Sequence, residues 1–87
     1  MRFENAFVSR EHRYSLGVEV DSGRHYMAIP ASNQIVDYIE YYKLSDHEYV
    51  ELGKDGSLAV DFADSCRRRE RDDRLFMNPG ADRGVPR

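Results

Sequence analysis

Three histidines and one cysteine are the first side chains of this sequence to consider for metal binding or catalysis. His12, His25 and His47 are far apart, and neither an H-x-x-x-H nor a C-x-x-C spacing occurs. Zinc sites typically show closely spaced ligands of that kind, and calcium sites a dense run of alternating acidic residues, which is also missing, so no metal site is predicted. A G-x-S-x-G elbow and a glycine-rich phosphate loop before a helix are also missing. No catalytic residue and no cofactor is therefore predicted, and a non-enzymatic role is favoured.

A cluster of arginines at residues 67–74 is the second chemical feature. Guanidinium groups bind phosphates and carboxylates with paired hydrogen bonds, which makes Arg67, Arg68 and Arg71 candidate binding residues. Three acidic residues are interleaved with the arginines, however, and offer them partners within the chain. A helix end with internal salt bridges is therefore favoured over a phosphate site.

An acidic segment with many tyrosines is the third feature. Residues 37–64 hold eight acidic residues against two lysines, and four of the six tyrosines of the chain. Asp37, Glu40 and Tyr41 fall on the side of a predicted helix that faces away from its apolar stripe, and tyrosine is common in binding hot spots. This acidic, tyrosine-bearing surface predicts a protein partner with a basic surface, such as the target of an inhibitor or immunity-type protein.

The elements that must position these residues begin with a hairpin. Apolar residues alternate with polar ones over residues 14–20, which is the pattern of a half-buried strand. The Ser22-Gly23 pair predicts a two-residue turn, and residues 24–29 predict the returning strand. Counted outward from this turn, His25 lies opposite Val20 at the end of the apolar face, where it could bind a ligand.

Three further segments are predicted to be helices. Residues 33–43 carry apolar residues at positions i, i+4 and i+7, which is the spacing of a helix face. The Ser45-x-x-Glu48 sequence matches a capping box and predicts a short helix, although a strand over residues 46–52 stays open as an alternative. Residues 57–71 predict a third helix, whose acidic residues come early and whose basic residues come late, as the helix dipole favours.

Strands are predicted towards both ends of the chain. Residues 2–9 and the hairpin predict three sequential strands in an antiparallel β-meander, and residues 74–78 predict a short strand that returns to its edge. Residues 79–87 contain two glycines and two prolines and predict a flexible C-terminal tail. The sequence thus predicts a single α+β domain over residues 1–78, with a small antiparallel meander packed on one face by two to three helices.

Composition sets the broad class of protein. The chain has 87 residues, of which 40% are apolar and 33% charged, so its core is thin and a homodimer would add stability. Its one cysteine cannot form an intramolecular disulfide, and no apolar run approaches the ~18 residues of a membrane-spanning helix. A cytoplasmic location and no membrane partner are therefore expected.

The leading functional hypothesis is a non-enzymatic protein–protein interaction or accessory module that uses the acidic, tyrosine-bearing surface. The alternative is a small-molecule-binding protein or minor enzyme with a site near His25, Tyr26 and the C-terminal arginines. A nucleic-acid binder that uses Arg67–Arg74 is the third hypothesis. The net charge of −3 disfavours it, because nucleic-acid binding depends on the neutralisation of phosphates.

Overall fold

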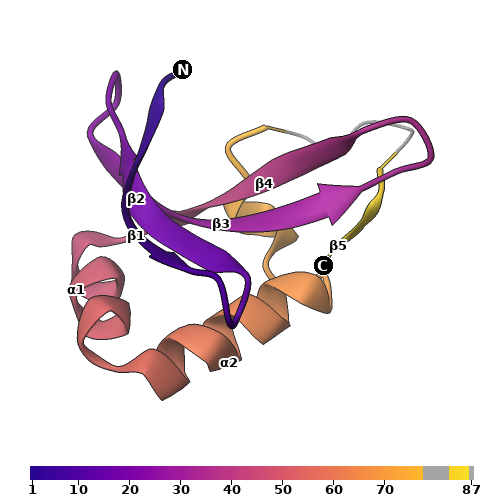
Figure 1. Cartoon of the computed structure of the whole chain (residues 1–87). Helices are drawn as coiled ribbons and strands as arrows, with labels where there is room; N and C mark the ends of the chain where they lie inside the picture. The colour runs from indigo at the N-terminus through magenta and orange to yellow at the C-terminus, as the bar shows by residue number, and fades with distance from the viewer. Residues whose placement is uncertain (78–82, 87) are drawn as a thin grey trace.

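A twisted antiparallel sheet with helices on one face forms the fold (Figure 1). The computed structural model describes residues 1–77 and 83–86. Its elements, in chain order, are β1 (Phe3–Ser9), β2 (Tyr14–Glu19), β3 (Arg24–Ser32), β4 (Asp37–Leu44), α1 (Asp46–Lys54), α2 (Gly56–Arg67), the 3₁₀ helix η1 (Asp72–Arg74) and β5 (Val85–Pro86). The strand order is β1-β2-β3-β4, and β5 pairs with the end of β3.

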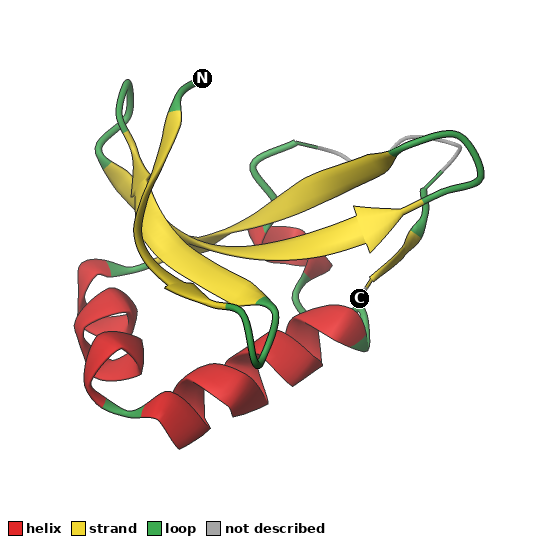
Figure 2. Cartoon of the chain, in the orientation of Figure 1, coloured by secondary structure: helices red, strands yellow, loops and turns green. Residues whose placement is uncertain are grey.

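The predicted class is confirmed in its outline. The sheet is antiparallel, and Figure 2 shows α1 and α2 on the same side of it, so that neither of these helices covers the other face. The details differ in the sheet, since the described residues form four long strands and the short β5 where three strands and a possible C-terminal strand were predicted; the two α-helices lie within the predicted two to three. No helix within residues 1–77 and 83–86 is long and apolar enough to span a membrane.

The core lies between the sheet and the helices. Its buried members come from β2, β3, β4 and both helices, and they include Leu16, Met27, Ile29, Tyr42, Leu44, Leu52, Ala59, Phe62, Ala63 and Cys66. Burial raises the pKa of the Cys66 thiol to about 12, so this thiol stays protonated at neutral pH and does not act as a nucleophile.

Residues 33–43 do not form the predicted helix; most of this segment belongs to strand β4, so the helix prediction is wrong. Burial alternates along β4, because Tyr42 and Leu44 are buried against the helices whereas Asp37 on the opposite face is exposed. The apolar residues fit both the helical and the strand period. Pairing with β3 along the whole of β4 decides in favour of the strand.

The hairpin of β2 and β3 forms as predicted, but its register and turn differ from the prediction. His25 pairs with Val18 rather than Val20, so the turn spans residues 20–23. The turn is longer because the Glu19 carboxylate accepts hydrogen bonds from three backbone N–H groups in and beside it, at 2.9 to 3.0 Å. A register shift of two residues keeps the side chains of β2 and β3 on their predicted faces, whereas Val20, predicted on the apolar face, lies in the turn and is 37% exposed.

The capping box forms as predicted and starts α1. The Ser45 hydroxyl accepts a hydrogen bond from the Glu48 N–H at 3.1 Å, and the Glu48 carboxylate accepts one from the Ser45 N–H at 2.8 Å. Because these bonds satisfy backbone donors of a first helical turn, residues 46–52 form a helix and not the alternative strand.

Helix α2 ends earlier than predicted. It stops at Arg67 because Arg69 has a φ of 64°, which turns the chain out of the helix. The N–H groups of Arg69 and Glu70 then donate to the carbonyls of Cys66 and Ser65, a pattern that closes helix C-termini. Residues 68–71 therefore lie beyond the helix in which they were predicted.

The C-terminal segment folds back onto the sheet. The predicted strand at residues 74–78 is reduced to a single bridge between Leu75 and Tyr42, and Asn78 lies outside the described residues. Of the predicted tail, residues 79–87, the structure describes residues 83–86, and there β5 pairs with Ala31 and Ser32 of β3.

Replacing Gly53 with alanine is expected to stabilise the protein by about 0.5 kcal/mol. Gly53 lies in the last turn of α1, and a Cβ atom there would have no heavy atom within 4 Å. The alanine therefore reduces the conformational freedom of the unfolded chain without a clash in the folded one. Urea denaturation followed by circular dichroism measures the change, and a midpoint below that of the wild type would contradict the expectation.

Candidate functional site

The structure divides the predicted acidic surface between the two faces of the sheet. Alternate residues of a strand point to opposite faces, so Asp37 and Tyr41 share one face while Glu40 points to the other. Asp37 is exposed, and Tyr41 stacks on Phe3 with ring centroids 3.6 Å apart. Glu40 is only 7% exposed. It therefore does not belong to the surface that a partner would meet.

Glu40 instead holds the C-terminal segment in place. Its carboxylate accepts hydrogen bonds from Arg69 at 2.6 Å, from Arg83 at 2.8 Å and from the Tyr42 hydroxyl at 3.1 Å. Arg83 also pairs with Asp72 at 2.7 Å. Burial alone would raise the pKa of Glu40, but the two guanidinium groups outweigh it and hold that pKa below its ordinary value. The cluster is a structural ion-pair network that ties β5 to β4.

The predicted arginine site is engaged by the chain itself. Arg67 pairs with Asp64 at 3.0 Å, and Arg68 pairs with Glu70 at 2.8 Å. The third candidate, Arg71, donates to the hydroxyl of Ser65 and lies over the Phe62 ring, 4.8 Å from its centroid. Of the interleaved acids, only Glu70 pairs with one of these three arginines, and the partners of the other two lie within α2. These contacts leave the three arginines with less capacity for a phosphate than a free cluster would have.

His25 and Tyr26 point to opposite faces of β3. The His25 ring stacks on Tyr49, 3.9 Å between centroids, and its Nδ1 lies 2.9 Å from a carboxylate oxygen of Asp46 at the start of α1. Tyr26 is fully buried on the other face, where its hydroxyl donates to Asn5 at 2.6 Å. The two residues proposed together for a small-molecule site are therefore separated by the sheet.

The face of the sheet that no helix covers carries a depression. We call it the open face and define it by Val8, Arg10, Arg13, Ser15, Ala28, Pro30, Asp37, Ile39 and Tyr41. Two pockets of about 370 and 340 Å³ share Arg13, Pro30 and Ile39 as lining residues, and the larger one continues around the end of the sheet to Ala31 and Tyr38, which point to the other face. The two pockets are therefore parts of one continuous depression.

Strand register explains the shape of the open face. Ser15 pairs with Ala28, and these two small residues line the floor of the depression between the larger side chains of β1 and β4. Val8 on one side is 54% exposed and Ile39 on the other is 43% exposed. An apolar centre is therefore accessible to solvent.

An aromatic cluster closes one end of the open face. Phe3 packs edge-on against Tyr26 and Phe76, with ring centroids 5.4 and 5.2 Å apart, and stacks on Tyr41. This packing buries Tyr26 and fixes the position of Tyr41 beside the depression. The cluster gives the open face a rigid wall of aromatic side chains.

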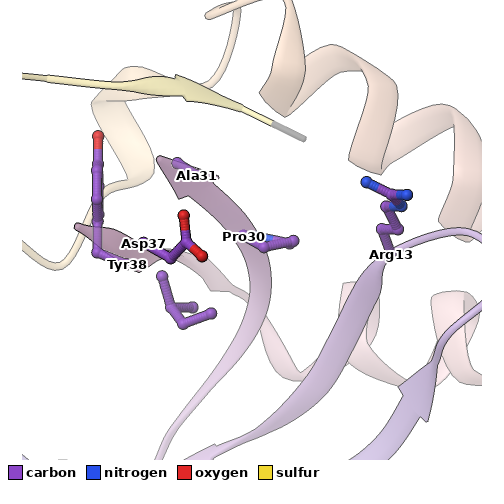
Figure 3. A pocket seen from close by; sticks show the side chains of 6 residues that line it. Arg13, Pro30, Ala31, Asp37 and Tyr38 are labelled. Carbon is purple, nitrogen blue, oxygen red and sulfur yellow. The ribbon is translucent and has the colours of Figure 1, made fainter. Parts of the chain in front are cut away.

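Charges of both signs flank the apolar centre. Figure 3 shows Arg13 and Asp37 on either side of Pro30. Among the described residues, the side chains of Arg10, Arg13 and Asp37 form no hydrogen bond or ion pair. They are therefore available to a partner, in contrast to Arg67, Arg68 and Arg71.

Sequence reasoning missed the arginines of the β1–β2 turn. Arg67 donates to the backbone carbonyls of His12 and Arg13, each at 2.7 Å, and so fixes this turn against α2. The Arg13 side chain is then directed over the open face. No local signal could have placed it there, because Arg13 precedes β2 with a φ of 56°, so the alternation of the strand does not extend to it.

The open face combines apolar and charged side chains. Within the described residues no group of three or more His, Cys, Asp or Glu side chains is placed to hold a metal ion. The open face offers an apolar centre with a charged rim, which is the composition of a protein-binding patch. Comparison of the chain with protein-family models, with curated proteins and with solved structures gives no match, so its function has to be inferred from this geometry.

Proposed function

We propose that this chain is a non-enzymatic interaction module that binds a protein through the open face of its sheet. The observation that carries the proposal is the accessible apolar centre around Val8 and Ile39, with the unpaired charges of Arg13 and Asp37 beside it. An antiparallel sheet can leave one face in water, but such a face is normally polar. An apolar centre with a polar rim on an uncovered face favours a docking surface.

This proposal revises the interaction predicted from the sequence. Asp37 and Tyr41 remain in the surface, whereas Glu40 is replaced by Arg10 and Arg13. The partner therefore does not need a uniformly basic surface, because the open face presents both signs of charge. We keep the cytoplasm as the proposed location, which the single, buried cysteine favours.

A photo-crosslinking amino acid at position 39 tests the proposal. In the cells from which the chain comes, the variant with benzoylphenylalanine in place of Ile39 is expected to form a covalent adduct with a polypeptide. The matched control carries the same amino acid in place of Leu58, which is 44% exposed on α2 and so as accessible as Ile39 at 43%. No adduct at position 39, or equal adducts at both positions, would argue against a docking role for the open face.

A further inference from the structure

We propose that the protein bound by the open face is a second copy of this chain, in a twofold dimer that packs sheet against sheet. This inference rests on the proposed function, since it names the partner of the same surface. A twofold interface uses one patch on both subunits, so that patch must be complementary to itself in charge and in shape.

The charges of the open face meet this requirement. Arg13 and Asp37 lie on either side of Pro30, and neither side chain has a partner among the described residues. In a face-to-face dimer the twofold axis lies in the plane of the interface. We place this axis over Pro30 and perpendicular to the line from Arg13 to Asp37. Rotation about it exchanges the two ends of the line, so that Arg13 of each copy meets Asp37 of the other. A uniformly acidic or basic partner would neutralise only one of the two charges.

The apolar centre is complementary to itself as well. Ile39 projects from β4, while the floor of the depression beside it is formed by the small side chains of Ser15 and Ala28. A projection and a hollow on the same face allow Ile39 of each copy to enter the hollow of the other. Packing of two apolar sheet faces is a common way for sheets to bury such surface.

The β1 edge of the sheet is less suited to dimerisation than the open face. β1 is an edge strand, but its pairing with β2 is interrupted by an irregularity between Asn5 and Phe7. Bulges of this kind disturb the ladder and protect an edge from pairing with another chain. We therefore assign the self-association to the open face and not to continuation of the sheet through β1.

Sedimentation equilibrium of the purified full-length chain is the first measurement. The wild type is expected to show a monomer–dimer equilibrium. Reversal of either charge, in Arg13→Glu or in Asp37→Arg, places like charges together at both ends of the interface and is expected to raise the dissociation constant roughly tenfold or more. The matched controls are Lys54→Glu on α1 and Asp61→Arg on α2, which make the same charge changes at exposed positions of the helical layer and are expected to change nothing.

Rescue distinguishes this dimer from other modes of association. Arg13→Glu mixed with Asp37→Arg is expected to form a heterodimer of wild-type affinity, because each pair then joins opposite charges. The double variant Arg13→Glu/Asp37→Arg is expected to recover a homodimer for the same reason. A double variant or a mixture that stays as weak as the single variants would overturn the proposed arrangement.

Failure of the dimer and failure of the proposed function give different results. A wild type that is monomeric throughout, with an adduct at position 39 to a different protein, overturns the dimer and leaves the open face as a docking surface. A monomer without any adduct at position 39 overturns both. An adduct of twice the mass of the chain, lost on reversal of Arg13, supports both.

Discussion

Replacing Glu40 with glutamine is expected to lower the free energy of unfolding by about 3 kcal/mol, because removal of one partner from a buried ion pair leaves the other charge uncompensated. The Glu40 side chain is 7% exposed, and it meets the guanidinium groups of both Arg69 and Arg83. Glutamine keeps the shape but removes the negative charge. Urea denaturation measures the global loss. Faster hydrogen exchange within residues 83–86 would report the release of β5 from β3.

The matched control for this variant is Glu70→Gln. Glu70 is also paired with an arginine, Arg68, but both side chains are more than half exposed. Exposed pairs of this kind contribute little to stability, so this variant is expected to unfold close to the wild-type midpoint. If Glu40→Gln costs no more than Glu70→Gln, the Glu40 network does not hold the C-terminal segment.

The same network predicts the response of the protein to acid. The pKa of Glu40 is lower in the folded chain than in the unfolded one, where it is about 4.3. Its stabilising contribution is therefore complete above that pH and is lost as the pH falls through the folded value. Hydrogen bonding from Ser22, and then from the backbone of Asp21 and Arg2, lowers the pKa of Glu19 to about 2. The stabilising contribution of Glu19 is therefore also lost as the pH falls. The free energy of unfolding is therefore expected to decrease as the pH falls below the unfolded-state pKa of about 4.3. The decrease is expected to be less steep in Glu40→Gln than in the wild type.

Buried Glu40 also explains why β4 was mistaken for a helix. Along β4 the strand period places Tyr38, Glu40 and Tyr42 on one face, and a charged residue in that series argues against a buried strand. The residues that make the burial of Glu40 favourable, Arg69 and Arg83, are 29 and 43 positions away in the sequence. A local pattern cannot reveal such partners, whereas the competing helical spacing of the apolar residues was fully visible.

Features that depend on neighbouring residues were predicted well. The capping box involves only Ser45 and Glu48, and both of its hydrogen bonds form. The alternation placed the side chains of residues 14–19 on the correct faces of the hairpin, although Val20 lies in the turn. The turn was misjudged because its length depends on the Glu19 carboxylate, whose bonds to backbone N–H groups do not follow from turn propensity.

The candidate site was less predictable, because tertiary contacts decide which charges remain accessible. The arginines at positions 67, 68 and 71 stood out in the sequence as a cluster, yet each has a partner in the fold. Arg13 did not stand out, and it becomes available because α2 holds the backbone of its turn and leaves its side chain free. Composition therefore predicted an interaction surface within residues 37–64, whereas the surface proposed here, the open face, follows from the fold.

Replacing Gly17 with alanine is expected to lower the free energy of unfolding by about 3 kcal/mol, since an extra methyl group here would overpack the sheet. A Cβ atom at this position would collide with the backbone carbonyl oxygen of Glu4 and would lie 2.6 Å from the hydroxyl oxygen of Tyr26. The carbonyl cannot move without the strand to which it belongs. Urea denaturation measures the loss.

The collision also reaches the open face through Tyr26. The Tyr26 side chain passes over Gly17 to donate its hydrogen bond to Asn5, and the Tyr26 ring packs against Phe3 and Tyr41. Displacement of Tyr26 is therefore expected to disturb the aromatic wall and to weaken binding at the open face in addition to stability. For stability alone, Ser15→Ala is the matched control, because Ser15 lies on the same face of β2 and already carries a Cβ atom. If Gly17→Ala proved as stable as Ser15→Ala, then β1 and Tyr26 could not lie as close to Gly17 as the structure places them.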